Sequence, residues 1–378
     1  MIYVLKKVFD LFASYGLAVI LLFLLLLLVL FGTLEQVDHG LFEVQKKYFE
    51  SFWLVHWLFG KIPIPLPGVY LLLTLLFINL LCGAIIRAPK SWRRPGLLIA
   101  HFGILFLIFS GFVTYHFSIN GHMTLFEGQQ SDEFQSYYDW EIVIAETQGN
   151  PTIKQWIIPG DRFQYLKPNE SKTFYAQGLP FEFELTGFLR NCAPIVQGDG
   201  ITLRELPLEK EAERNIAGVF VQVKGEDGTL HPGLLWGMQQ SPWVVTVAGK
   251  SYSLDLRHQR WQLPFTIVLN KFKRELHPRT NMASNFESEV TKIEDGVERR
   301  INIRMNEPLR HKGYTFFQAS WGPQDAGPND RLFSVFAVAK NPADHWPLYA
   351  CIVIASGLIL HFTQTLFRYL RRQRRIPA

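Results

Sequence analysis

Cysteine is nearly absent from this chain of 378 residues, which contains only Cys82, Cys192 and Cys351. No Cys-x-x-Cys occurs, and this absence argues against a self-contained thiol oxidoreductase. Only Cys192 falls in the long polar part of the sequence. A lone thiol there has no partner for a disulfide within that part, even in an oxidising compartment.

The motifs of the common enzyme classes are missing as well. The sequence has no Gly-x-Ser-x-Gly, Walker loop, Gly-x-Gly-x-x-Gly or His-Glu-x-x-His, and no Cys/His cluster at zinc spacing. We therefore predict no catalytic residue in this chain. Any enzymatic role would be that of a non-catalytic or co-catalytic subunit.

Charge is missing from four long apolar runs, which contain no Asp, Glu, Lys or Arg. They are Leu11–Leu34, Ile62–Ile86, Pro95–Phe126 and Trp346–Phe367. A bilayer core of about 30 Å requires about 20 helical residues, and each run reaches that length. Lys6 and Lys7 before the first run are compatible with a signal peptide, but no Ala-x-Ala-like cleavage site follows it. The sequence therefore predicts four transmembrane helices, the first of which is retained as an anchor.

The distribution of charge predicts the orientation of these helices. With the N-terminus inside, the cytoplasmic segments 1–10, 87–94 and 368–378 hold 11 Lys and Arg and one acid, Asp10. The two outer segments hold 27 Lys and Arg and 32 Asp and Glu. This is the positive-inside pattern, so we expect a multi-pass protein of the cytoplasmic (inner) membrane with both termini in the cytoplasm. The net charge of +5 then reflects membrane orientation and predicts no nucleic-acid partner. The Arg tail after Arg368 can also contact membrane lipid, but we favour its interpretation as a topology signal.

These spans divide the chain into five parts. We predict a cytoplasmic N-terminus with the first helix, an outer loop, a helical hairpin around a basic cytoplasmic turn, an extracytoplasmic domain, and a last helix with a basic tail. Their bounds are 1–34, 35–67, 68–117, 118–345 and 346–378.

The outer loop carries apolar residues at helical spacing. They are Leu41, Val44, Tyr48, Phe52, Val55 and Phe59. This stripe predicts an amphipathic helix that lies either on the outer membrane face or against the extracytoplasmic domain. The prolines in Ile62-Pro-Ile-Pro-Leu-Pro-Gly68 predict an extended segment before the second membrane helix.

The extracytoplasmic domain is predicted to be rich in β-strands. Apolar and polar residues alternate in 181–185, 219–223 and 301–305, and aromatic and β-branched residues dominate 313–318 and 332–338. Such short strands predict an antiparallel sandwich or an open barrel. The one helix expected in this domain, around 206–215, has a weak pattern.

Two histidines lie inside the apolar runs. His101 and His361 are both predicted in the cytoplasmic half of the bilayer, roughly 7–9 Å from their helix ends. An ionisable residue inside a membrane is costly and faces protein or a cavity. Two imidazoles at one level are suited to bind a haem iron, or each can form a hydrogen bond to a neighbouring helix. For the histidines outside the runs or at their outer boundary we expect ordinary surface roles; these are His39, His56, His116, His122 and His345.

Near the end of the β-rich domain stands Met305-Asn-Glu-Pro-Leu-Arg-His-Lys-Gly-Tyr-Thr-Phe-Phe-Gln-Ala-Ser-Trp321. This block resembles the Asn-x-Pro-Leu…Gly-Tyr…Tyr-Gln-x-Ser-Trp signature of ResB-type (CcsB-type) cytochrome c biogenesis proteins, with Phe317 in place of the second Tyr. The stretch from Phe286 to Gly296 is similar to a second segment of that family. Cys82 resembles the cysteine often found where the second helix of the family ends. The order of helices and β domain is also similar over essentially the whole chain.

The resemblance implies a subunit of the System II cytochrome c synthase. With a ResC/CcsA-type partner, such a subunit carries haem b across the membrane for covalent attachment to apocytochrome c. In the family a histidine of the third helix is an axial ligand of the haem iron, and the matching position here is His101. His361 has no equally secure counterpart. Read physically, the 305–321 block is a loop that leads into a strand, and we favour a structural role for it.

Two further hypotheses remain open at this point. The extracytoplasmic domain can be a membrane-anchored binding module that holds apocytochrome c or a thioredoxin-like thiol reductant without binding haem. Alternatively, the chain can be a structural scaffold for its partner. Haem absorbance that is lost when His101 is replaced by alanine separates the first hypothesis from both.

Overall fold

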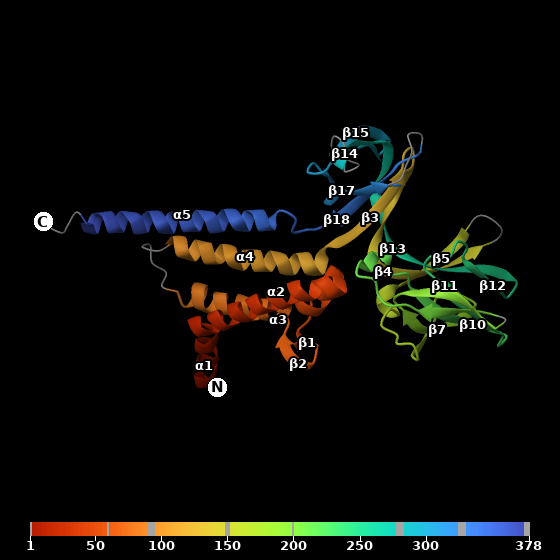
Figure 1. Ribbon diagram of the computed structural model, residues 1–378, viewed down its shortest axis with the longest axis horizontal. Helices are drawn as coiled ribbons and strands as arrows, with labels where there is room; N and C mark the ends of the chain where they lie inside the picture. Colours follow the sequence, from red (N-terminus) through yellow and green to blue (C-terminus); the bar gives the residue numbers. More distant parts are fainter. Residues whose placement is uncertain are drawn as a thin grey trace. The chain divides into compact units, whose positions relative to one another are not determined.

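The computed structural model describes residues 2–58, 60–88, 95–147, 152–198, 200–276, 283–323 and 330–373. The chain divides into two compact units, which we treat separately (Figure 1). The membrane unit comprises Met1–Ser118 and Asn341–Ala378, and the β unit comprises Ile119–Lys340. Phe59 of the predicted amphipathic stripe and residues 89–94 and 374–378 of the predicted basic turn and tail lie outside the described residues.

The membrane unit is helical. Its α-helices are α1 (Ile2–Phe12), α2 (Tyr15–Val44), α3 (Val69–Leu80), α4 (Pro95–Phe117) and α5 (Trp346–Gln373). The π-helical turns η1 (Gln45–Phe49) and η2 (Leu81–Ile86) extend α2 and α3. Within the described residues, four of these segments are long and apolar enough to cross a membrane, namely α2 with η1, α3 with η2, α4 and α5. The prediction of four transmembrane helices is confirmed.

The first membrane helix begins later and ends later than predicted. Ser14 is extended, and its hydroxyl accepts a hydrogen bond from the Leu17 amide at 3.2 Å, so it caps a new helix that begins at Tyr15. The short helix α1, which contains Lys6, Lys7 and Asp10, precedes this cap and was not predicted. At the other end α2 continues past Leu34, with a break in its backbone at Gly40 (φ 76°).

The outer loop was predicted incorrectly beyond Phe49. In place of an amphipathic helix that continues to Phe59, the structure has a hairpin of strands β1 (Trp53–Leu58) and β2 (Ile62–Pro67). Three prolines hold β2 extended and keep it out of a helix, and Gly60 at φ 69° lies in the turn. The extended segment predicted at 62–67 is confirmed.

The β unit contains sixteen strands in its described residues. They are β3 (Ile119–Phe126), β4 (Gln130–Thr147), β5 (Thr152–Pro159), β6 (Ser171–Phe174), β7 (Phe181–Leu189), β8 (Cys192–Gln197), β9 (Gly200–Glu205), β10 (Gly218–Gly225), β11 (Leu230–Trp236), β12 (Trp243–Val247), β13 (Lys250–Leu276), β14 (Ala283–Glu294), β15 (Val297–Arg304), β16 (Leu309–His311), β17 (Tyr314–Gly322) and β18 (Phe333–Lys340). Each of the five predicted strand segments overlaps a strand of this unit, and three of them extend one residue beyond it, at residues 305, 313 and 332.

The largest sheet has ten antiparallel strands. Its main path is β15-β14-β13-β4-β3-β18-β17-β16, while β12 pairs with β13 and β5 pairs with β4. A second sheet has the order β11-β10-β7-β6, and β8 pairs with β9 in a separate ribbon. Because β15 also lies close to β16 and β17, the large sheet nearly closes on itself at that end.

Two hydrophobic cores share the two longest strands of the β unit. Strand β4 contributes Ile142 to a sandwich core with β7 and β10, and it contributes Phe134 to the core of the nearly closed sheet. Strand β13 contributes Leu254 to the first core and Ile267 to the second. The prediction of a large β-rich domain with sandwich and barrel-like character is confirmed (Figure 1).

The helix expected around residues 206–215 is absent from the described chain. That stretch contains only the 3₁₀ turn Ala212–Arg214, called η4. Pro207 biases Leu206 toward an extended backbone, so Leu206 is excluded from a helix.

Candidate functional site

His101 lies in α4, six residues after Pro95, which begins the helix. Its ring Nδ1 lies 2.8 Å from the carbonyl oxygen of Leu97, one turn earlier. A carbonyl oxygen can only accept, so Nδ1 must carry the proton and donate it. In a neutral ring this leaves Nε2 with a free lone pair, which is the state required of an imidazole that coordinates a metal.

His361 lies in α5 with an unpaired ring nitrogen. Its Nδ1 is buried and has no hydrogen-bond partner, and the same is true of Oε1 of Gln364, three residues later. Buried polar groups are normally paired, so two unpaired groups within one helical turn indicate that a group from outside the described chain can complete this face.

A seam of small residues joins α4 and α5, which lie side by side (Figure 1). Gly96 faces the His361 backbone so closely that an added Cβ would lie 2.5 Å from the His361 nitrogen. Gly357 meets Ala100 in the same way. Small residues allow membrane helices to approach at backbone distance, and this close approach fixes their register.

The register brings both histidines to one end of the membrane unit but offsets their levels. His361 lies opposite Gly96, and Gly357 lies opposite Ala100. At 1.5 Å per residue, His101 and His361 are therefore roughly 8 Å apart along the helix axes. They do not share one level as predicted, because the close packing of the glycines determines the register.

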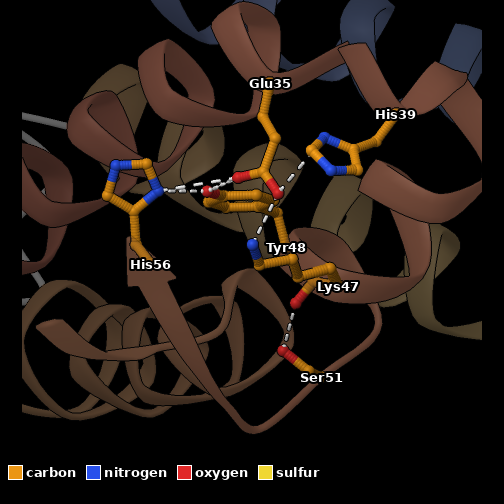
Figure 2. Close-up of polar contacts among 6 residues, drawn as sticks. All are labelled: Glu35, His39, Lys47, Tyr48, Ser51 and His56. Atoms are coloured by element: carbon orange, nitrogen blue, oxygen red, sulfur yellow. Dashed lines mark hydrogen bonds and ion pairs between the residues drawn. The ribbon is translucent and has the colours of Figure 1, made fainter. Parts of the chain in front are cut away.

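A polar cluster at the other end of this unit was missed by the sequence analysis (Figure 2). Tyr48 of η1 is fully buried, and its hydroxyl lies 2.5 Å from both Glu35 Oε2 of α2 and His56 Nδ1 of β1. Lys47 Nζ lies 2.5 Å from Glu35 Oε1. His39, which is 63% exposed, lies 3.9 Å from the same oxygen. The only signal in the sequence was a charged residue, Glu35, directly after a run without charge.

The ring of His56 is fixed in its plane. Phe31 stacks on it with a centroid distance of 4.4 Å and an interplanar angle of 9°. The His56 side chain is only 13% exposed, and that of Glu35 is 15% exposed. The prediction that His56 has an ordinary surface role is therefore wrong.

The remaining boundary histidines differ in their surroundings. His116 lies near the end of α4, and its Nε2 is 3.0 Å from the Tyr70 hydroxyl. In the β unit, His122 and His258 each have a buried, unpaired Nδ1. Burial lowers the pKa of His122, and burial together with the nearby His122 lowers the pKa of His258 to about 4. Both rings are therefore neutral near pH 7.

The 305–321 block forms β16 and β17, and its contacts are those of a structural element. The Gln318 amide donates to Ser334 Oγ at 2.8 Å, and its Oε1 lies 2.6 Å from Ser288 Oγ. Both serines are fully buried. The Trp321 ring stacks on Phe272 at 5.8 Å.

Charged residues of this block also support the end of β14. Lys312 and His311 contact Glu294, which Lys292 contacts as well. Hydrogen bonds from Lys292 and Lys312 lower the pKa of Glu294 to about 2. These contacts connect β14 to the turn before β17, in agreement with the structural role favoured from the sequence.

Cys192 is buried at the start of β8, with 2% of its surface exposed. Burial raises the pKa of its thiol to about 11, so almost none of it is thiolate near pH 7. This environment is that of a packing residue and differs from that of a reactive thiol.

The fold defines a class: an integral membrane protein whose helices flank a large β-rich unit in the sequence. Within it, residues 230–331, from β11 to the approach to β18, match the model of the ResB-like family. The chain is 25% identical over 171 residues to the cytochrome c biogenesis protein CcsB of Synechococcus sp. (strain CC9902), which covers 44% of this chain and 38% of the relative. It is 32% identical over 90 residues to the CcsB protein of Prochlorococcus marinus (strain NATL1A), covering 24% of this chain and 21% of the relative.

The aligned regions therefore span between 21% and 38% of the length of these two relatives. The resemblance to ResB-type proteins that the 305–321 block predicts is confirmed. This block lies inside the matched residues 230–331.

Proposed function

We propose that this chain acts in cytochrome c biogenesis as the haem-handling subunit of a membrane-bound cytochrome c synthase. The observation that carries the proposal is the tautomer of His101, whose Nε2 is left with a free lone pair inside a membrane-spanning helix. The names of the similar proteins support the same process.

In this function haem b is a substrate that passes through the membrane. Nε2 of His101 binds the iron, and the bond from Nδ1 to the Leu97 carbonyl holds the ring in the ligating tautomer. His361 and Gln364 supply unpaired polar groups at the same end of the unit. His361 is the candidate for the second axial position, together with a histidine of the partner.

Attachment itself is assigned to a ResC/CcsA-type partner. Each thiol of a Cys-x-x-Cys-His site adds its S–H across a haem vinyl double bond, which forms one C–S bond and one C–H bond. Cys192, the cysteine of the β unit, offers no reactive thiol for such a step, because it is buried and its thiol pKa is raised. Apocytochrome c is the acceptor, and the extracytoplasmic β unit faces it.

The first experiment purifies the chain with its partner and measures the absorbance of reduced haem. We expect His101→Ala to lose this absorbance and covalent cytochrome c together, and His101→Gly to regain part of both with added imidazole. His116→Ala is the matched control, because His116 lies on the same helix but bonds to Tyr70. Normal haem content and cytochrome maturation in the His101→Ala variant would overturn the proposal.

A second experiment tests the orientation. A reporter that is active only outside the cytoplasm is expected to be inactive after Ala378 and active when inserted after Gly228, which lies in a turn of the β unit. The reverse pattern would place the β unit in the cytoplasm and contradict the proposal.

A further inference from the structure

The outer end of the membrane unit contains a second imidazole prepared as a ligand. Glu35 directly follows the charge-free run of α2, 20 residues and about 30 Å from the start of that helix at Tyr15. The start of α2 is bound to the end of α3 by Asn79, whose side-chain amide donates to the carbonyl of Ser14, the cap of α2, at 3.0 Å and to that of Phe12, the last residue of α1, at 2.6 Å. Helix α4, with His101, begins at that same end. The cluster around Glu35 therefore lies at the opposite end of the unit from His101.

The hydrogen bonds of the cluster determine the tautomer of His56. Lys47 next to Glu35 Oε1 favours an ionised carboxylate, which can only accept hydrogen bonds. The single proton of the Tyr48 hydroxyl is therefore donated to Glu35 Oε2, and the hydroxyl oxygen must accept from His56. His56 thus carries a proton on Nδ1, and in the neutral ring Nε2 has the free lone pair.

The remaining ring nitrogen faces away from the cluster. Figure 2 shows Nε2 of His56 on the side of the ring opposite Tyr48 and Glu35. Among the described residues Nε2 of His56 has no hydrogen-bond partner, and this atom is not completely buried. A carboxylate that acts on Nδ1 raises the basicity of an imidazole and fixes its orientation, as is usual for histidines that ligate metals.

We propose that His56 Nε2 is a second ligand for haem iron, at the outer end of the membrane unit, and that Tyr48 and Glu35 are its positioning residues. This inference rests on the proposed function, because it assumes that haem is the substrate. One imidazole with a free Nε2 at each end of the helices gives the chain an inner and an outer binding position for the same iron.

The experiment uses the full chain in detergent micelles, with His101→Ala and His361→Ala introduced so that only the outer position remains. Haemin is titrated into this background, and the Soret band is recorded. We expect a saturable haemin spectrum that His56→Ala abolishes and that His56→Cys shifts to the position of a thiolate ligand. His345→Ala is the matched control: His345 is also an exposed histidine of the membrane unit, but it pairs with Asp344 outside the cluster, so its loss should leave the spectrum unchanged.

The positioning residues require a different readout. Tyr48→Phe keeps the packing of the ring but removes the link between Glu35 and His56, so we expect about tenfold weaker haemin binding and a more positive reduction potential. If His56→Ala fails to fold, His56→Gln retains a hydrogen-bonding group for Tyr48 but cannot ligate iron, and it should still lose the spectrum.

The outcomes separate this inference from the proposed function. A haemin spectrum that persists unchanged in both the His56→Ala and His56→Gln variants would refute the outer ligand, while the role of His101 would stand. Binding of Zn²⁺ or Cu²⁺ that depends on His56, without binding of haemin, would also refute it. Loss of function of His101 variants is measured separately, so failure of the proposed function would appear there.

Discussion

Replacement of Gly357 by alanine tests whether the seam between α4 and α5 holds the membrane unit together. The added Cβ would lie 2.5 Å from the Ala100 nitrogen and 2.7 Å from the Gly96 oxygen, whereas ordinary contacts begin at 3.4 Å. Both neighbours are backbone atoms of a helix and cannot rotate away. The two helices must therefore separate by about 0.9 Å, and a gap of this size forfeits a quarter to a half of the dispersion energy of the contacts it opens.

Overpacking of the seam and the higher helix propensity of alanine act in opposite directions on the free energy of unfolding of Gly357→Ala. Overpacking of a close contact costs about 1–3 kcal/mol, and alanine in place of glycine favours a helix by about 1 kcal/mol. We therefore expect Gly357→Ala to lower the free energy of unfolding by up to about 2 kcal/mol, and Gly357→Val to lower it further. The same change shifts the His361 backbone away from Gly96.

The assay is reversible unfolding of the purified chain by sodium dodecyl sulfate in mixed micelles, followed by circular dichroism. Gly111→Ala is the control, because Gly111 lies in α4 with nothing within 4 Å of an added Cβ. This variant should be neutral or stabilised by up to about 1 kcal/mol. Equal unfolding midpoints for Gly357→Ala and Gly111→Ala would refute the reasoning from the seam.

Three further predictions concern the β unit. The pKa of His258 is lowered to about 4 in the folded chain, below its unfolded value near 6.5, so the unfolded state takes up the proton first as pH falls. The resulting stabilisation of the folded state, up to about 3 kcal/mol, is present above pH 6.5 and is lost toward pH 4. Melting temperatures of the full chain at pH 7.5, 5.5 and 4.5 should therefore fall less steeply in the His258→Gln variant. Gln318→Met should lower the free energy of chemical unfolding by about 2–3 kcal/mol, because the hydroxyls of Ser288 and Ser334 lose their amide partner. Phe317→Tyr, on the opposite and partly exposed face of the strand, should be nearly neutral, and equal effects of the two changes would contradict the role of the buried network. Cys192→Ala should leave cytochrome c maturation intact. At pH 7 a maleimide should label Cys192 in the denatured chain but not in the native chain, and rapid labelling of the native chain at Cys192 would show that its thiol is not buried.

The membrane helices could be predicted because their signal is compositional. A run of 20 residues without charge has few alternatives to a transmembrane helix, whatever its neighbours are. The boundaries were less accurate, because they depend on local caps such as Ser14 and on a helix that continues past Glu35 after the apolar run has ended. The short helix α1 was not predicted, although Lys6, Lys7 and Asp10 fall at helical spacing on one face of it and the other face is apolar.

The outer loop shows why periodicity can mislead. Tyr48, Phe52 and Val55 fit a helical stripe, yet within β1 the burial alternates, with Leu54 and His56 on one side and Trp57 on the other. A short apolar run fits both the helical period of 3.6 residues and the strand period of 2, and the choice between helix and strand depends on whether a partner strand is present. Here the partner is β2, whose prolines exclude a helix.

The two histidine sites differ in what a sequence can reveal. His101 stands alone in an apolar run, and the cost of burying an ionisable group in a membrane is sufficient to identify it as a candidate. The ligating geometry of His56 depends on a glutamate, a tyrosine and a phenylalanine from two other segments. The backbone break at Gly40 and the π-helical turn bring them together, and no spacing in the sequence predicts either feature.

The seam between α4 and α5 also has a consequence for how the protein is made. Gly96 and Gly357 are in contact, but the ribosome adds Gly357 long after Gly96. At the usual 5–20 residues per second the delay is roughly 10–50 s, during which the whole β unit is synthesised. Throughout this interval the small-residue face of α4 has no α5 to cover it. The contact between Gly96 and the His361 backbone therefore forms only when translation is nearly finished, and a chain truncated before Trp346 would insert three membrane helices but would lack the helix that closes the seam.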